Sequence, residues 1–157
     1  MTHSGGCACG QVRYELEGEP IWTQMCYCSD CQRISGSAYG LNLMVVEPQL
    51  HIDGSTKSTF LPTGSGSGCE NHFCSECATN IWGHYLIAPP GLFIVRAGTL
   101  DDTSWLKPDA QVFTKDRQPW VAIADGVPAY DERCIPSEDW PASSLKKLKD
   151  FLSANQN

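Results

Sequence analysis

The sequence predicts a mainly β fold with a short helix near its C-terminus. Three observations lead to this expectation: many short apolar runs separated by glycine or proline, one segment of strict two-residue alternation, and one set of leucines at helical spacing. The chain has 157 residues, of which 41% are hydrophobic. It is therefore expected to form a single domain, residues 1–157, with a core of its own.

The alternation lies within residues 11–17, where Val12, Tyr14 and Leu16 face one way and the residues between them face the other. This pattern is typical of a half-buried strand. Further strands are expected at residues 22–25, 38–46, 50–53, 56–61, 69–74, 80–86, 92–97, 111–114 and 120–123. Gly54 and Ser55 fit a hairpin turn between the strands at 50–53 and 56–61.

The remaining segments are expected to be loops or helix. Residues 29–34 suggest a turn or a single helical turn, and the glycine-rich residues 63–68 suggest a loop. Leu145, Leu148 and Leu152 share one face at helical spacing, and Ser143 or Ser144 can cap that helix.

The charge balance argues against nucleic acid as a partner. The formal net charge is −7, and the only cluster of lysines, at residues 146–149, lies on the expected helix. The N-terminus lacks the basic start and apolar run of a signal peptide, and no stretch approaches the ~20 apolar residues of a membrane span. We therefore expect a cytoplasmic protein without a membrane or nucleic-acid partner; the oligomeric state is left open.

Seven of the nine cysteines fall into three clusters with short spacing. The clusters are Cys7-Ala-Cys9, Cys26-Tyr-Cys28-Ser-Asp-Cys31 and Cys74-Ser-Glu-Cys77. In a reducing compartment such clusters more often bind metal than form disulfides. Zinc prefers deprotonated sulfur in a tetrahedron, and two cysteines in a short turn can reach one ion. The sequence therefore predicts two zinc ions per chain.

Seven sulfur ligands divide naturally into four and three. The expected closed, structural site comprises Cys7, Cys9, Cys74 and Cys77. The expected open site comprises Cys26, Cys28 and Cys31, which are the candidate catalytic residues. A zinc ion with three protein ligands keeps one position for water or a substrate thiol, whose pKa it lowers.

Two other interpretations remain open. All seven cysteines could be structural, with Cys69 as an eighth ligand that closes the second site. Alternatively, Cys28-Ser-Asp-Cys31 could be a redox dithiol, although the βαβ context of thioredoxin-like motifs is missing.

The cysteine motifs and their neighbours resemble the glutathione-dependent formaldehyde-activating enzyme family, which also includes centromere protein V. The resemblance is carried by residues 5–15, 26–36 and 72–77, and Trp120 with residues 127–130 fits the family's C-terminal part. The resemblance implies a β-tent of small antiparallel sheets around zinc and the same division of the ligands. It also implies a carbon–sulfur lyase that adds glutathione to formaldehyde, giving S-hydroxymethylglutathione.

Two residues depart from the family's pattern. Ala78 stands where the family usually has glycine after Cys-x-x-Cys, and His72 stands where an arginine is typical. Glycine suits a left-handed position at such a knuckle, and alanine there costs about 1 kcal/mol.

We expect a zinc-dependent carbon–sulfur lyase-like enzyme that acts on a small thiol–aldehyde adduct, with glutathione as one candidate thiol. The alternative is a non-catalytic, zinc-stabilised interaction module. Arg33 could bind a substrate carboxylate or form a surface ion pair with Asp30. His84 could line a cleft, and Cys69 and Cys134 are expected to be a buried thiol and a loop thiol.

Overall fold

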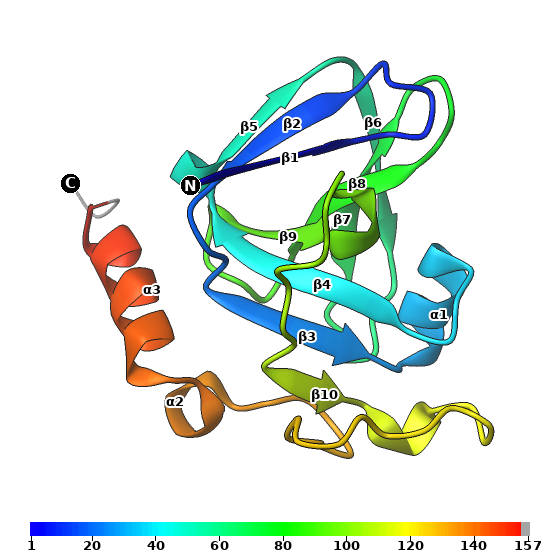
Figure 1. Cartoon of the computed structure of the whole chain (residues 1–157), viewed down its shortest axis with the longest axis vertical. Helices are drawn as coiled ribbons and strands as arrows, with labels where there is room; N and C mark the ends of the chain where they lie inside the picture. The colour runs from blue at the N-terminus through cyan, green and yellow to red at the C-terminus, as the bar shows by residue number, and fades with distance from the viewer. Residues whose placement is uncertain (155–157) are drawn as a thin grey trace.

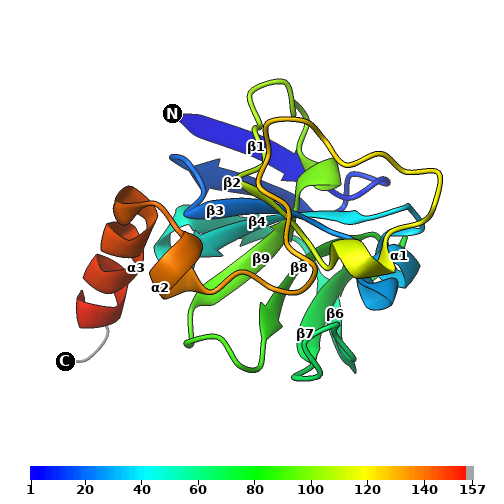
Figure 2. The ribbon, with the colours of Figure 1, turned by 90° about the horizontal axis from the view of Figure 1, so that it is seen from below.

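The computed structural model describes residues 1–154, and it is mainly β, as the sequence predicts. Within this part of the chain, ten strands form two sheets (Figure 1). Helices α1 and α3 lie beyond opposite ends of the central strands in both views (Figures 1 and 2). None of the helices in residues 1–154 is both long enough and apolar enough to cross a membrane.

The smaller sheet has three antiparallel strands in the order β1 (Thr2–Gly6), β2 (Arg13–Glu17) and β5 (Leu50–Asp53). The alternation that predicts β2 is confirmed, because Val12, Tyr14 and Leu16 are all buried. The sequence analysis missed β1, since its residues Thr-His-Ser-Gly-Gly lack apolar alternation and, apart from Thr2, have low strand propensity.

The larger sheet has seven strands in the order β10, β3, β4, β9, β8, β7, β6. Their bounds are β3 (Trp22–Cys26), β4 (Gly40–Val46), β6 (Thr56–Leu61), β7 (Cys69–Cys74), β8 (Asn80–Tyr85), β9 (Leu92–Arg96) and β10 (Ala110–Val112). Strand β10 runs parallel to β3, whereas the other pairs are antiparallel. The antiparallel pairing that the family resemblance implies is therefore not found at this edge.

The hairpin expected around Gly54 and Ser55 does not form. Both strands exist, but β5 pairs with β2 of the smaller sheet and β6 pairs with β7 of the larger one. Gly54 has a φ of +107°, and a Cβ at this position would lie 2.3 Å from the carbonyl oxygen of Gln11. Gly54 therefore serves a close approach between segments where the chain passes from one sheet to the other.

The segment after β10 also differs from the prediction. Residues 120–123 form an irregular segment that begins in a turn, not a strand, and the Trp120 side chain is 78% exposed. The expected C-terminal helix is confirmed as α3 (Ala142–Ala154), which begins before either predicted cap. A short helix that was not predicted, α2 (Pro136–Asp139), precedes it.

The buried side chains form two clusters. One joins the two sheets and includes Val12, Leu16, Leu43 and Ile81. The other lies against the opposite face of the larger sheet, where it includes Trp22 of β3 and Trp140 from the C-terminal part. The segment 29–34 forms helix α1 (Ser29–Ser35) at the end of β3, next to this second cluster.

Candidate metal centre and active site

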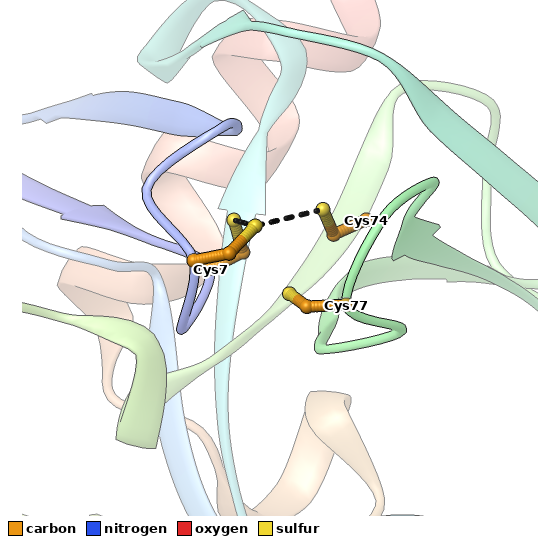
Figure 3. A group of neighbouring side chains, drawn as sticks. Cys7, Cys74 and Cys77 are labelled. Atoms are coloured by element: carbon orange, nitrogen blue, oxygen red, sulfur yellow. Dashed lines mark hydrogen bonds between the residues drawn. The ribbon is translucent and has the colours of Figure 1, made fainter.

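Four cysteines from two turns meet between the sheets. Cys7 and Cys9 lie in the turn between β1 and β2, whereas Cys74 ends β7 and Cys77 lies in the turn that follows it. Their sulfurs lie within 4.8 Å of one another. In Figure 3 the labelled side chains of Cys7, Cys74 and Cys77 point toward a common centre.

The spacing of these sulfurs suits a tetrahedral metal ion. Cys7 Sγ and Cys9 Sγ are 3.4 Å apart, and Cys9 Sγ and Cys74 Sγ are 3.7 Å apart. A zinc tetrahedron with bonds of about 2.3 Å has edges of about 3.8 Å. The four expected structural ligands are thus placed where one ion could contact all of them.

Local backbone geometry holds these sulfurs in place. Cys74 and Ala78 form the knuckle, in which the Ala78 N–H donates to the Cys74 carbonyl at 3.0 Å. Ala78 has a φ of +58°, the left-handed conformation expected at this position. On the other turn, the Val12 N–H donates to Cys7 Sγ at 3.2 Å.

The second group contains Cys26, Cys28 and Cys31. Cys26 ends β3, Cys28 precedes α1, and Cys31 lies in the first turn of that helix. All three are buried, and their sulfurs lie within 4.8 Å of one another. No further cysteine, histidine or acidic residue of residues 1–154 joins this group, so Cys69 is not placed as its fourth member.

The three thiols cannot all ionise on their own. Hydrogen bonds from the thiols of Cys26 and Cys31 lower the pKa of Cys28 to about 2. The same contacts, together with burial, raise the pKa of Cys26 far above its usual range. Three thiolates so close together would repel one another, and a cation between them would relieve that repulsion. All three sulfurs could then become thiolates, which is the donor set that a thiophilic ion such as zinc requires.

A glycine of the 63–68 loop lies directly against this group. A Cβ at Gly64 would stand 2.6 Å from Cys28 Cβ and 3.0 Å from Cys28 Sγ. The backbone N–H of Gly64 also hydrogen-bonds to Cys28 and favours its thiolate. The loop was predicted, but its place over the three sulfurs was not.

A cavity of about 390 Å³ opens beside the three sulfurs. Cys26, Cys28 and Cys31 all lie in its wall, whereas none of the four cysteines of the other group does. Most of the wall is apolar and includes Ile34, Met44, Leu92, Ile94, Phe113 and Trp140. The second group is therefore the one that a small molecule can approach.

Other candidate residues lie outside this cavity. Arg33 forms an ion pair with Asp30 at 3.2 Å, and its side chain is 75% exposed. The ring of His72 stacks on Trp82 with 3.7 Å between centroids, and His84 contacts the carbonyl oxygen of Pro89. Neither histidine belongs to the cavity wall, so His84 does not line this cleft.

The cavity wall also contains Tyr85, Arg96 and Cys134, which the sequence analysis did not place at the site. Tyr85 and Arg96 end strands β8 and β9, and both reach the cavity. The only available signal was a charged residue, Arg96, at the end of an otherwise apolar strand. Cys134, expected as a loop thiol, is buried in the same wall. Cys69 is a buried thiol as expected, and it also lines the wall.

Comparison with known proteins gives matches both in sequence and in structure. A family model described as glutathione-dependent formaldehyde-activating enzyme matches residues 2–116. A curated protein of Halomonas elongata, provisionally named as an enzyme of that type, is 33% identical over 87 residues, covering 52% of this chain. The match spans 55% of that relative's length. A solved Rhodobacter sphaeroides protein matches with a TM-score of 0.48 and 19% identity, covering 81% of this chain and 98% of its own.

Proposed function

Because this chain belongs to the glutathione-dependent formaldehyde-activating enzyme family, we propose that it is a zinc-dependent carbon–sulfur lyase. Its substrate would be an adduct of a small thiol and an aldehyde, such as S-hydroxymethylglutathione. The observation that carries this proposal is the position of Cys26, Cys28 and Cys31 in the wall of a 390 Å³ cavity. We further propose that residues 1–157 form one zinc-binding domain with the β-tent arrangement.

Zinc fits both groups of sulfurs, in two different ways. The group of Cys7, Cys9, Cys74 and Cys77 would surround an ion completely, which is typical of a structural site. The group of Cys26, Cys28 and Cys31 would leave one position for an external ligand. When bound there, zinc would stabilise a substrate thiol as its thiolate.

The residues around the second group hold it in a fixed geometry. The backbone N–H groups of Cys31 and Gly64 point at Cys28, and the Asn42 amide points at Cys31 Sγ from 3.9 Å. These contacts favour negative charge on the sulfurs and fix their direction. A substrate entering the cavity would therefore meet a preorganised site rather than a mobile one.

The reaction itself needs positioning more than new bonds to the protein. In the addition direction, a thiolate sulfur gives an electron pair to the aldehyde carbon, and the carbonyl oxygen becomes a hydroxyl group after taking a proton. In the lyase direction, the carbon–sulfur bond breaks and the carbonyl group forms again. Arg133 and Asp30 at the cavity offer charges for a zwitterionic thiol.

The test is the rate at which glutathione and formaldehyde exchange with their adduct, measured by exchange NMR against the uncatalysed rate. We expect the wild-type chain to accelerate the exchange, and Cys28→Ser to abolish the acceleration. Ser29→Ala, which changes an exposed neighbour outside the cavity, should behave as wild type. Equal exchange rates with and without wild-type protein, for glutathione and for small thiols, would leave the interaction module as the better interpretation.

A further inference from the structure

One face of the larger sheet forms the floor of the cavity. Alternate residues of each strand point to the same face, and the cavity wall takes such residues from β3, β4, β9, β8 and β7. They are Gln24, Cys26, Met44, Leu92, Ile94, Arg96, Tyr85 and Cys69. The floor is therefore continuous from the three sulfurs to the far strands, and it carries polar groups at the ends of β8 and β9.

The Arg96 guanidinium is fixed above this floor by two amide side chains. It donates to Asn42 Oδ1 at 2.5 Å and to Asn71 Oδ1 at 2.7 Å. Asn42 in turn points its Nδ2 at Cys31 Sγ, so a single amide separates the guanidinium from the sulfur group. Arg96 is thus held close to the three cysteines in one orientation.

This cation has no carboxylate partner within the described residues. The ion pairs formed by residues 1–154 do not include Arg96, and its Nε is buried without a hydrogen-bond acceptor. Burying a cation is costly unless an anionic or strongly polar group compensates it. The nearby sulfur of Cys31 supplies part of this compensation. Since Arg96 lines the cavity, a negatively charged oxygen of a bound molecule could add to it.

Tyr85 lines the same cavity as Arg96. Tyr85 is directly opposite Cys69 in the β7–β8 register, which places both side chains on the cavity face. The phenolic hydroxyl of tyrosine is a hydrogen-bond donor, so Tyr85 can donate to an oxygen atom of a molecule bound in this cavity.

We propose that Tyr85 and Arg96 form an oxyanion subsite, in which the Tyr85 hydroxyl donates a hydrogen bond to the reacting oxygen of the aldehyde. The inference rests on the proposed lyase function. As the thiolate sulfur bonds to the carbonyl carbon, the π electron pair moves to the oxygen, which becomes an alkoxide. The alkoxide accepts the hydrogen bond from Tyr85 and then takes a proton from water, while the proton of the thiol has already gone to water. Preorganised donors of this kind stabilise the transition state more than the ground state.

The kinetic test compares Tyr85→Phe with Tyr39→Phe, a tyrosine outside the cavity wall. Removing one oxyanion donor is expected to lower kcat by about 10²-fold or more with little change in KM. Tyr39→Phe should change kcat less than about 2-fold, and both variants should melt within a few degrees of wild type. A Tyr85→Phe variant with wild-type kcat would overturn the subsite, whereas an inactive wild type would overturn the lyase proposal instead.

A binding test is independent of turnover. The probes are mercaptoacetate, which carries an anionic oxygen beside its thiol, and ethanethiol, which lacks it; both are titrated calorimetrically into the metal-loaded protein. Tyr85→Phe is expected to weaken the binding of mercaptoacetate by about 10-fold or more and the binding of ethanethiol by less than about 2-fold. The reason is that only mercaptoacetate loses a charge-assisted hydrogen bond. Equal losses for both probes, or no loss for either, would overturn the proposal.

Discussion

Gly64 and Cys28 approach each other so closely that no side chain fits between them: a Cβ on Gly64 would lie 2.6 Å from Cys28 Cβ. Gly64→Ala must therefore displace either the loop or the sulfur group. We expect this change to lower stability by about 1–3 kcal/mol, the usual cost of overpacking, and to lower activity more than stability suggests.

The matched control is Gly98→Ala, because a Cβ at Gly98 would meet no atom within 4 Å. Thermal unfolding and the exchange rate of the adduct should be measured for both variants. If Gly64→Ala has the same melting temperature and the same exchange rate as Gly98→Ala, the close approach of Gly64 to Cys28 contributes neither to stability nor to activity.

The two sulfur groups should differ in what their loss does to the fold. Metal analysis should find about two zinc ions per wild-type chain and about one in Cys28→Ser, with the circular dichroism spectrum preserved. Cys74→Ser should lose the folded state, because a closed four-ligand site contributes folding free energy directly. A folded Cys74→Ser chain, or an unfolded Cys28→Ser chain, would reverse the two assignments.

Ala78 occupies a left-handed conformation that suits glycine better, with a φ of +58°. Ala78→Gly is therefore expected to raise the free energy of unfolding by up to about 1 kcal/mol, because the strain at Cβ is removed. Ala8→Gly is the control: Ala8 is exposed in the other cysteine turn, and its φ is not positive. Urea denaturation should show a gain only for Ala78→Gly, and a loss there would show that flexibility outweighs strain.

Asp109 should make the folded state less stable as the pH rises. Burial raises the pKa of Asp109 above its ordinary value of 3.8, although the hydrogen bond from the Thr23 N–H partly offsets this. The folded state therefore binds this proton more tightly than the unfolded state, so stability falls as the pH rises from about 3.8 through the folded pKa.

Asp109→Asn keeps an oxygen acceptor but cannot ionise. Between pH 4 and pH 7 its free energy of unfolding should fall less than that of the wild type. Urea denaturation of both proteins at a series of pH values measures this difference. Asp53→Asn, at an exposed strand end, is the control and should follow the wild-type curve. Identical pH dependence in Asp109→Asn and wild type would contradict this account.

The sequence predicted the elements best where local signals and tertiary packing agree. Strand β2 follows from the alternation of Val12, Tyr14 and Leu16, and both cysteine groups assemble from the clusters expected to supply them. The short cysteine turns are determined largely by their own residues. Which cysteines can share a metal ion is therefore predictable from the local sequence. Strand β1 lacked any such signal, because its partner β2 rather than its own residues makes it a strand.

The errors concern relations between distant segments. The turn at Gly54 suggested a hairpin, but turn residues do not determine which sheet each strand joins. Trp120 suggested a strand although its side chain is left exposed. Tyr85 and Arg96 could not be placed in the site, because their approach to the cysteines depends on the register of five strands.

The four-sulfur group joins two turns that the ribosome makes at different times. Cys9 and Cys74 are 65 residues apart, so at about 5–20 residues per second the first turn emerges roughly 3–13 s before the second. During that interval the nascent chain presents a pair of thiols without their later partners. During synthesis, therefore, an unsuitable metal ion or an oxidant can reach Cys7 and Cys9 before Cys74 and Cys77 are present to complete the group.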